Sequence, residues 1–414
     1  MPSVKRFLRT AVSDSLPNLC AAGCFLLVLT AMAAFTGQWC WQPNGYNSYS
    51  LQADAWLHGQ LDLGRDYPWL ELAIYEGRYY VSFPPFPSYI LLPFSLIWGT
   101  HTPDGWISLF FSLAGVWTCV SLARQSGRSS TGSVALTLFL YLGTGYLFIA
   151  LTPAVWFFAQ TLCFNLCIFA LYAAMRQRGG MSLTAWACAV GCRPMVILYL
   201  PALLILLWHS YHESHPRDSL YSTVKKHWYW SIGPLFLAIS YMMLNYNRFG
   251  SIFEFGHNYL PEFQRAEYGQ FSLTYLGEHL SEMIRLPSWN PETQRLAFQP
   301  FETWCFVLIN PLSLLAVAVS VRRLFKTRGP VHRGLILAIL ASSMVYALFL
   351  CCHRTLGGWQ FGNRYFKDIM PFLFCALCLT MPDNRHLRSI STVLFAWSVS
   401  LHLLGTVITW NYWW

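Results

Sequence analysis

Long apolar runs alternate with short polar segments along most of this 414-residue chain. Several of these runs come close to the ~20 residues that an α-helix needs to cross a bilayer. No internal repeat and no separate soluble segment interrupts the pattern. We therefore expect an all-α, polytopic membrane protein in which residues 1–414 form a single membrane domain. The runs predict about eleven membrane-spanning helices, at 17–36, 105–123, 132–150, 154–175, two within 182–209, 228–246, 303–321, 333–352, 366–381 and 389–409.

One of these runs is interrupted. Residues 182–209 are apolar but contain Gly191-Cys192-Arg193-Pro194. Proline has no N–H to continue the helical hydrogen-bond ladder, so the run predicts two helices that meet at this break.

Two long segments between the spans, 37–103 and 247–302, are predicted to lie outside the membrane. The first contains an apolar stretch, 84–98, that begins with prolines and ends before Gly99. We interpret this stretch as an interfacial helix, because a full span there would put Arg124 and Arg128 on the wrong side.

The distribution of charge sets the orientation. Seventeen of the 27 Lys and Arg residues fall in the short segments predicted to be inside, whereas fourteen of the 18 Asp and Glu residues fall outside. Because cytoplasmic loops are enriched in Lys and Arg, we expect the N-terminus inside, the C-terminus outside and a location in the cytoplasmic membrane.

Composition agrees with this class of protein. Hydrophobic residues make up 55% of the chain and charged residues 11%, against roughly 25% charged in soluble domains. The net charge of +9 is spread over short clusters, without the long basic run of a nucleic-acid-binding protein, so no nucleic-acid partner is expected. Most of the thirteen cysteines lie in apolar runs, without the spacing of metal ligands.

Four polar stretches fall on the predicted outer side or at the helix break. They are Gln52–Leu63 with Arg78-Tyr79-Tyr80 and the proline-rich stretch after it, Arg193-Pro194, Tyr246–Tyr259, and Gly358–Tyr365. In their order and placement they resemble the GT-C glycosyltransferases, integral membrane enzymes that take sugars from polyprenyl-phosphate carriers. The resemblance implies transfer of a sugar to a lipid-linked or cell-surface acceptor, on the extracytoplasmic face of the membrane.

The resemblance also implies an acidic residue in the first outer segment that acts on the acceptor. A carboxylate can take the proton that a sugar hydroxyl loses when it attacks the anomeric carbon. The adjacent acidic pair of the superfamily is missing here, since that region is Asn44-Gly45-Tyr46-Asn47. The first carboxylate after the first span is Asp54, which could equally be a solvated or capping residue. The predicted catalytic residues are Asp54, Asp62 and Glu76, with Asp66 and Glu71 as further alternatives.

The leaving polyprenyl phosphate would need a cation, and the planar fork of arginine meets phosphate oxygens with two hydrogen bonds. The candidates are Arg364, Arg193, Arg248 and Lys367. Two simpler roles stay open: Arg364 could pair with Asp368, and Arg193 could reach from the broken helix to the interface.

The remaining binding positions follow from the same stretches. Substrate contacts are expected from Arg78, Tyr79, Tyr80, His257, Asn258 and Tyr365. No His, Asp or Glu cluster has convincing metal spacing, so the sequence assigns no metal ligand, although a divalent cation would be compatible with it.

Three other functions compete with glycosyl transfer. A transporter or flippase would carry ionisable residues near the middle of the membrane and an inverted repeat, and the sequence shows few of the former and none of the latter. A glycan polymerase or ligase would also use outer arginines, but on a diphosphate-linked oligosaccharide. A scaffold without catalysis is the third alternative, because the acidic pair is missing.

Overall fold

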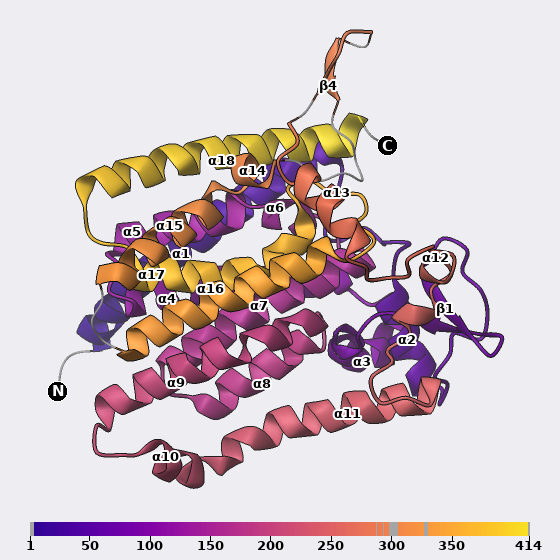
Figure 1. Cartoon of the computed structure of the whole chain (residues 1–414), viewed down its shortest axis with the longest axis horizontal. Coiled ribbons are helices and arrows are strands. Elements are labelled where there is room, and N and C mark those ends of the chain that lie inside the picture. Colours follow the sequence, from indigo (N-terminus) through magenta and orange to yellow (C-terminus); the bar gives the residue numbers. More distant parts are fainter. Residues whose placement is uncertain (1–3, 287, 293, 298–304, 327–329, 413–414) are drawn as a thin grey trace.

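The computed structural model is a bundle of helices that run roughly parallel to one another (Figure 1). It describes residues 4–286, 288–292, 294–297, 305–326 and 330–412. The N-terminus lies at one end of the bundle and the C-terminus at the other. The start of the predicted span 303–321 and the end of the predicted outer segment 247–302 fall outside the described residues.

The described chain is mostly helical. In chain order the helices are α1 (Val4–Thr36), α2 (Ser48–Leu57), α3 (Phe86–Trp98), α4 (Asp104–Gln125), α5 (Ser130–Leu142), α6 (Tyr146–Ala150), α7 (Val155–Met175), α8 (Gly179–Val190), α9 (Leu200–Ser214), α10 (Leu220–Lys226), α11 (Ile232–Phe249), α12 (Pro261–Gln264), α13 (Thr274–Glu282), α14 (Phe306–Ile309), α15 (Pro311–Lys326), α16 (Pro330–Cys351), α17 (Met370–Thr380) and α18 (Arg385–Tyr412). Short 3₁₀ helices are η1 (Pro194–Tyr199), η2 (Trp228–Ser231), η3 (His257–Tyr259) and η4 (Arg364–Ile369). Two antiparallel hairpins are formed by β1 (Leu72–Tyr75) with β2 (Arg78–Val81), and by β3 (Ser288–Asn290) with β4 (Arg295–Ala297).

Six helices among the described residues are long and apolar enough to cross a membrane. The chain is therefore an integral membrane protein, whereas the number of spans and their orientation stay predictions. The shorter apolar helices α3, α5 and α8 fill other predicted positions, with α3 at the predicted interfacial stretch. The six are Ser15–Thr36, Asp104–Gln125, Val155–Met175, Pro194–Ser214, His332–Cys351 and Arg385–Asn411.

The predicted break in 182–209 is confirmed. Helix α8 ends at Val190, and Arg193 takes an extended conformation with φ −142° before η1 begins at Pro194. Because Pro194 has no N–H, it fits the first position of the new helix without losing a hydrogen bond. The break turns the Arg193 side chain out of the α8 axis.

A second break was not predicted. The run 132–150 is divided between α5 and α6 at Gly143-Thr144-Gly145. A Cβ atom on Gly145 would lie 2.9 Å from the Phe361 carbonyl oxygen and would clash with the Lys367 side chain, so glycine lets the loop before η4 approach this closely. The break therefore makes room for the segment that carries Arg364.

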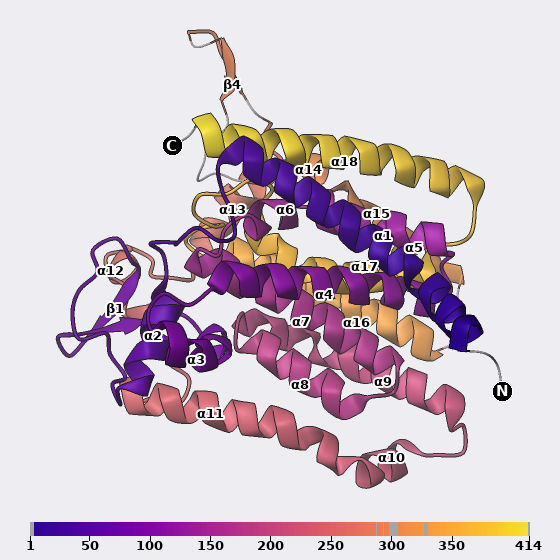
Figure 2. The ribbon, with the colours of Figure 1, turned by 180° about the vertical axis from the view of Figure 1, so that it is seen from behind.

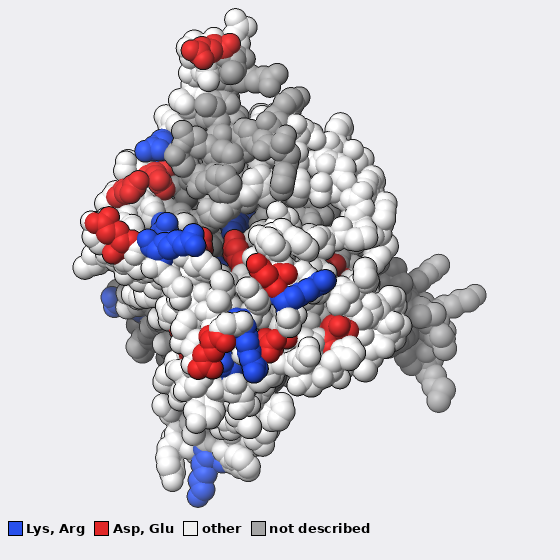
Figure 3. Space-filling model, turned by 90° about the vertical axis from the view of Figure 1, so that its right-hand side faces the viewer, with Lys and Arg blue, Asp and Glu red and all other residues white. Residues whose placement is uncertain are grey.

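The predicted outer segments gather at one end of the bundle. Elements α2, α3, β1 and α12 lie together there in both views of the ribbon (Figures 1 and 2). The end-on view shows Asp and Glu side chains over this face, with a few Lys and Arg side chains between them (Figure 3). The β1–β2 hairpin turns at Glu76-Gly77, both with positive φ, which favours a tight two-residue turn.

Helix α7 is at the centre of the bundle. Of its 18-residue apolar window, 89% is buried, and α4, α8, α9 and α17 all pack against it. Its first turns reach the end of the bundle where the outer segments gather. Trp156 and Gln160 lie in these turns, and Gln160 donates a hydrogen bond to the Arg364 carbonyl.

Candidate functional site

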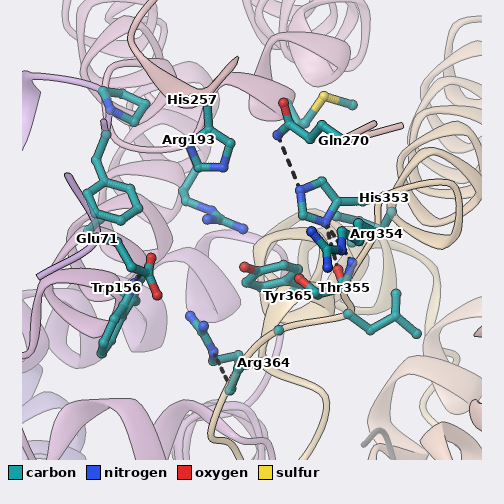
Figure 4. Close-up of a pocket in the computed structure, with 18 of the residues that line it drawn as sticks. Glu71, Trp156, Arg193, His257, Gln270, His353, Arg354, Thr355, Arg364 and Tyr365 are labelled. Carbon is teal, nitrogen blue, oxygen red and sulfur yellow. Dashed lines mark hydrogen bonds between the residues drawn. The ribbon is translucent and has the colours of Figure 1, made fainter. Parts of the chain in front are cut away.

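A cavity of about 1460 Å³ opens at this end of the bundle (Figure 4). Its walls come from segments far apart in the sequence, including the residues before β1, the start of α7, the break after α8, the η3 region, α13 and the segment 353–365. Polar residues in these walls include Glu71, Trp156, Arg193, His257, Asn258, His353, Arg364 and Tyr365.

Arg193 is held by a buried carboxylate. Its Nε donates to Oδ2 of Asp368 at 2.9 Å, and the Tyr346 hydroxyl donates to the same oxygen at 2.8 Å. Asp368 is 1% exposed, whereas the Arg193 side chain is 24% exposed and reaches the cavity, so a buried carboxylate depends on Arg193 and Tyr346 for its partners. The alternative pairing of Asp368 with Arg364 is therefore not the one that forms, because Arg193 occupies the carboxylate.

Arg364 has neutral partners. Its Nε donates to the Gly358 carbonyl at 3.2 Å, and its Nη1 is 3.4 Å from Oε1 of Gln160. Among the described residues, no carboxylate lies within 4 Å of its side-chain nitrogens. The guanidinium thus lines the cavity without a close ion pair among the described residues, and Glu71 and Asp368 act on its charge only from beyond 4 Å.

Tyr365 lies between the two arginines. The centroid of its ring is 4.8 Å from Cζ of Arg193 and 4.8 Å from Cζ of Arg364. Both guanidinium groups therefore contact one aromatic ring, an arrangement that stabilises each cation. Figure 4 shows the three side chains near one another in the cavity, with the Glu71 side chain facing them.

Glu71 is the carboxylate that faces the arginines. It precedes β1, and its Oε2 accepts a hydrogen bond of 2.9 Å from Nε1 of Trp156. Enclosure by the cavity walls raises the pKa of Glu71 above its usual value, while the Trp156 hydrogen bond and the charge of Arg364 oppose that rise. A carboxylate with a raised pKa is better matched to taking a proton near neutral pH.

Histidine side chains line the outer part of the cavity. Nδ1 of His257 lies 3.1 Å from the Ser82 carbonyl, so it carries the proton and leaves Nε2 as an acceptor. Burial, together with the charge of Arg193, lowers the pKa of His257 to about 4. The side chain is therefore a neutral hydrogen-bond acceptor at pH 7. Asn258 donates to Glu254, which also lines the cavity.

The carboxylates predicted to be catalytic lie elsewhere. Asp54 is on α2, with Nδ1 of His58 3.8 Å from its Oδ2, and Asp62 lies 3.5 Å from Nη1 of Arg78. Glu76 is in the turn of the β1–β2 hairpin. None of the three lines the cavity. Their catalytic role stays an untested prediction, and the placement favours the alternative Glu71.

Several predicted binding residues are also outside the cavity walls. Arg248 is 2% exposed and donates to the Val81 carbonyl and to Asn245, which ties α11 to β2. Lys367 is buried on the far side of Phe148, whose ring centroid lies 5.9 Å from Nζ. Arg78, Tyr79 and Tyr80 belong to β2 and do not line the cavity either.

Sequence reasoning missed His353, Trp156 and Gln160. Trp156 and Gln160 read as ordinary positions of an apolar run, and only their tertiary partners Glu71 and Arg364 single them out. No three His, Cys, Asp or Glu side chains converge as metal ligands in the part of the chain that is described. A divalent cation therefore has no residues assigned to it.

Comparisons with known proteins give a structural likeness. No family model matches the sequence, and no curated protein matches it. ArnT from Cupriavidus metallidurans, solved bound to undecaprenyl phosphate, aligns with 95% of this chain and 75% of its own, at 11% identity and a TM-score of 0.48. The archaeal oligosaccharyltransferase AglB from Archaeoglobus fulgidus, in complex with an inhibitory peptide and a dolichol-phosphate, aligns with 94% of this chain and 56% of its own, at 11% identity and a TM-score of 0.44.

The likeness spans nearly the whole chain, 95% of it for ArnT. At 11% identity and TM-scores below 0.5 it assigns no residue, substrate or reaction to this protein.

Proposed function

We propose that this chain is a membrane glycosyltransferase that moves a sugar from a polyprenyl-phosphate donor to a lipid-linked or cell-surface acceptor. The reaction takes place on the extracytoplasmic side. One observation carries the proposal: Arg364 lines a large cavity with no carboxylate of the described residues within 4 Å, whereas Arg193 in the same wall is neutralised by Asp368.

A phosphate would supply the missing negative charge. Its oxygens can accept two parallel hydrogen bonds from a guanidinium, and contacts of this kind are about twice as strong as those between neutral groups. The volume of about 1460 Å³ exceeds the ~300–1000 Å³ of most ligand sites, which leaves room for donor and acceptor together.

Glu71 would act as the general base. It would take the proton of the acceptor hydroxyl while the hydroxyl oxygen forms a bond to the anomeric carbon. The bond between that carbon and the phosphate oxygen breaks, and the phosphate leaves with both electrons beside Arg364. Trp156 holds the Glu71 carboxylate in place through its 2.9 Å hydrogen bond. His257 would accept a hydrogen bond from a sugar hydroxyl.

The proposal is tested by transfer in nanodiscs, with purified protein and a panel of radiolabelled polyprenyl-phosphate sugars. Removing a positioned general base typically costs about 10²–10⁴-fold in rate, so Glu71→Gln should lose transfer by that factor. Asp54→Asn is the matched control, because Asp54 is a carboxylate of the same outer segment that does not line the cavity.

Loss of transfer in Asp54→Asn alone would return the base to Asp54. Full activity in both variants would reject a carboxylate base at either position. A wild-type protein that transfers no sugar from any monophosphate donor would contradict the proposal. Diphosphate-linked donors and a lipid-translocation assay on the same nanodiscs then distinguish the ligase from the flippase.

A further inference from the structure

A second surface lies at the end of the bundle opposite the cavity, on the segment Ser219–Ser231, here called the inner anchor. It comprises the short helix α10 and the η2 turn, which Figures 1 and 2 show at the corner of the molecule beside the start of α11. Its apolar side chains point to solvent: Tyr221 is 78% exposed, Trp228 65% and Val224 61%. Side chains of this size are rarely left in water without a function.

Positive charge accompanies these apolar groups. Lys225 and Lys226 end α10 and are both exposed, and Arg217 lies just before the anchor. The two nearby acids are engaged: Asp218 accepts a hydrogen bond from Tyr211, and Glu213 lies 3.3 Å from Nε2 of His209. Lys226 donates from Nζ to the Tyr211 hydroxyl at 3.4 Å, and no carboxylate of the described residues lies within 4 Å of either lysine.

Next to the anchor is an open recess of about 440 Å³. Arg178, Tyr211, His227 and Trp230 contribute to its walls, and the rings of His227 and Trp230 stack at 4.2 Å. An arginine beside stacked aromatic rings suits a ligand with an anionic headgroup, which the arginine would contact, and an apolar part, which the rings would contact.

The anchor continues an apolar face of α11. Leu235, Phe236, Ile239 and Met243 on that helix are all more than half exposed. In a membrane protein such a face meets lipid. The segment with aromatic rings and lysines directly precedes this lipid-facing helix in the chain. This order of groups, apolar, aromatic and then basic, matches the order of layers at a membrane interface.

We propose that the inner anchor lies in the membrane interface and binds the headgroups of anionic phospholipids. Leu220, Tyr221, Val224 and Trp228 would insert among the upper acyl chains, while Lys225 and Lys226 contact phosphates, and Arg178 holds a headgroup at the recess. The inference does not depend on glycosyl transfer, since it concerns the opposite end of the molecule.

The test is hydrogen–deuterium exchange on the full chain in two kinds of nanodisc, one of phosphatidylcholine and one of phosphatidylcholine with phosphatidylglycerol. Amides of residues 219–231 should exchange more slowly when phosphatidylglycerol is present. Lys225→Ser combined with Lys226→Ser should weaken this protection by about fivefold for each lysine removed. High salt should weaken it as well.

Arg322→Ser combined with Arg323→Ser is the matched control, because it removes two exposed positive charges at the same end of the bundle, on α15. This variant should keep the protection of 219–231. Equal exchange in both lipids, an unchanged response in the lysine variant, or an equal loss in the control would each overturn the proposal.

Discussion

Two arginines in one cavity differ in what surrounds them, and this difference separates a structural from a binding role. Arg193 is joined to Asp368, so replacing it would leave a buried carboxylate without its cation, which typically costs about 3–5 kcal/mol in stability. Arg364 is held by the Gly358 carbonyl and Gln160, so its removal breaks no ion pair shorter than 4 Å among the described residues. Arg364 is thus the arginine that can be changed to test binding.

Arg364→Ala should weaken binding of a polyprenyl phosphate by roughly tenfold to a hundredfold, because a charge-assisted hydrogen bond contributes about 1.5–3 kcal/mol. Arg364→Lys should recover only part of this, since a point charge cannot form the two-pronged contact. Titration in nanodiscs measures the affinity. Arg78→Ala is the control, because Arg78 is an exposed arginine outside the cavity. Equal affinity in Arg364→Ala and wild type would remove Arg364 from the phosphate site.

Arg364 should also affect the pH dependence of transfer, through the pKa of Glu71. Glu71 works as a base only when it is deprotonated, so the rate should rise with pH through its pKa, which enclosure raises above 4.5. Arg364 lowers that pKa, and Arg364→Ala should therefore move the acidic limb of the rate profile to higher pH. Arg364→Lys keeps the charge and should leave the limb near its wild-type position. A limb that stays in place in the alanine variant would show that another group titrates.

At the scale of elements, the position of Arg364 depends on how the loop before η4 packs against α6 and α18. The loop Phe361-Gly362-Asn363 enters between α6 and α18, where a Cβ atom on Gly405 would lie 2.0 Å from Cζ of Phe361. Asn363 takes a left-handed conformation with φ 53°, which turns the chain into η4. The loop can therefore pack between these helices because the neighbouring position on α18 is a glycine.

Gly405→Ala should displace Phe361 and with it Arg364. Overpacking of this kind costs about 1–3 kcal/mol, and donor affinity should fall with it. Gly334→Ala is the matched control, because nothing lies within 4 Å of the added Cβ, and alanine favours a helix by up to about 1 kcal/mol. Thermal unfolding in detergent and the titration described above measure both effects. Identical behaviour of the two variants would show that the loop tolerates the methyl group.

The sequence predicted elements better where hydropathy or proline marks them. The break at Pro194 is confirmed because proline cannot continue a helix, and α3 lies at the predicted interfacial stretch. The break at Gly143 was missed because glycines inside an apolar run barely change its hydropathy. The β1–β2 hairpin was missed too, although the Glu76-Gly77 pair between two short apolar runs is a turn signal.

The site was predictable only in part, for a physical reason. Arg193, Arg364 and Tyr365 follow local signals, namely a helix break and a polar stretch before a span. Which carboxylate faces them is decided by tertiary contact: Glu71 meets Trp156, 85 positions further along the chain. No local pattern distinguishes Glu71 from Asp54 or Asp62, so the sequence left them as alternatives.

At the scale of the whole molecule, the two ends of the bundle differ in kind. One end holds the cavity and the segments predicted to lie outside, and the other holds the N-terminus and the inner anchor. The proposed reaction requires the cavity on the extracytoplasmic side, and this orientation puts the inner anchor at the cytoplasmic face.

Cysteine labelling tests this orientation. Gln60→Cys and Ser251→Cys should react with a membrane-impermeant maleimide added to intact cells, because both positions are exposed at the cavity end. Ser222→Cys and Ser389→Cys, exposed at the opposite end, should react only after the membrane is permeabilised. The parent protein with its native cysteines gives the background. Labelling of the second pair in intact cells would reverse the orientation and reject a reaction on the extracytoplasmic side.

The ion pair between Arg193 and Asp368 also bears on how the protein is made. The ribosome adds 175 residues between these partners, which takes roughly ten to thirty seconds at the usual pace of synthesis. Throughout that interval the nascent chain carries an arginine at a helix break without the carboxylate of Asp368 that pairs with it in the folded protein. The insertion machinery, water or a lipid phosphate must shelter that charge until η4 is delivered. Slowing translation between the two residues would prolong this exposure, and it should raise the fraction of chains that quality-control proteases remove.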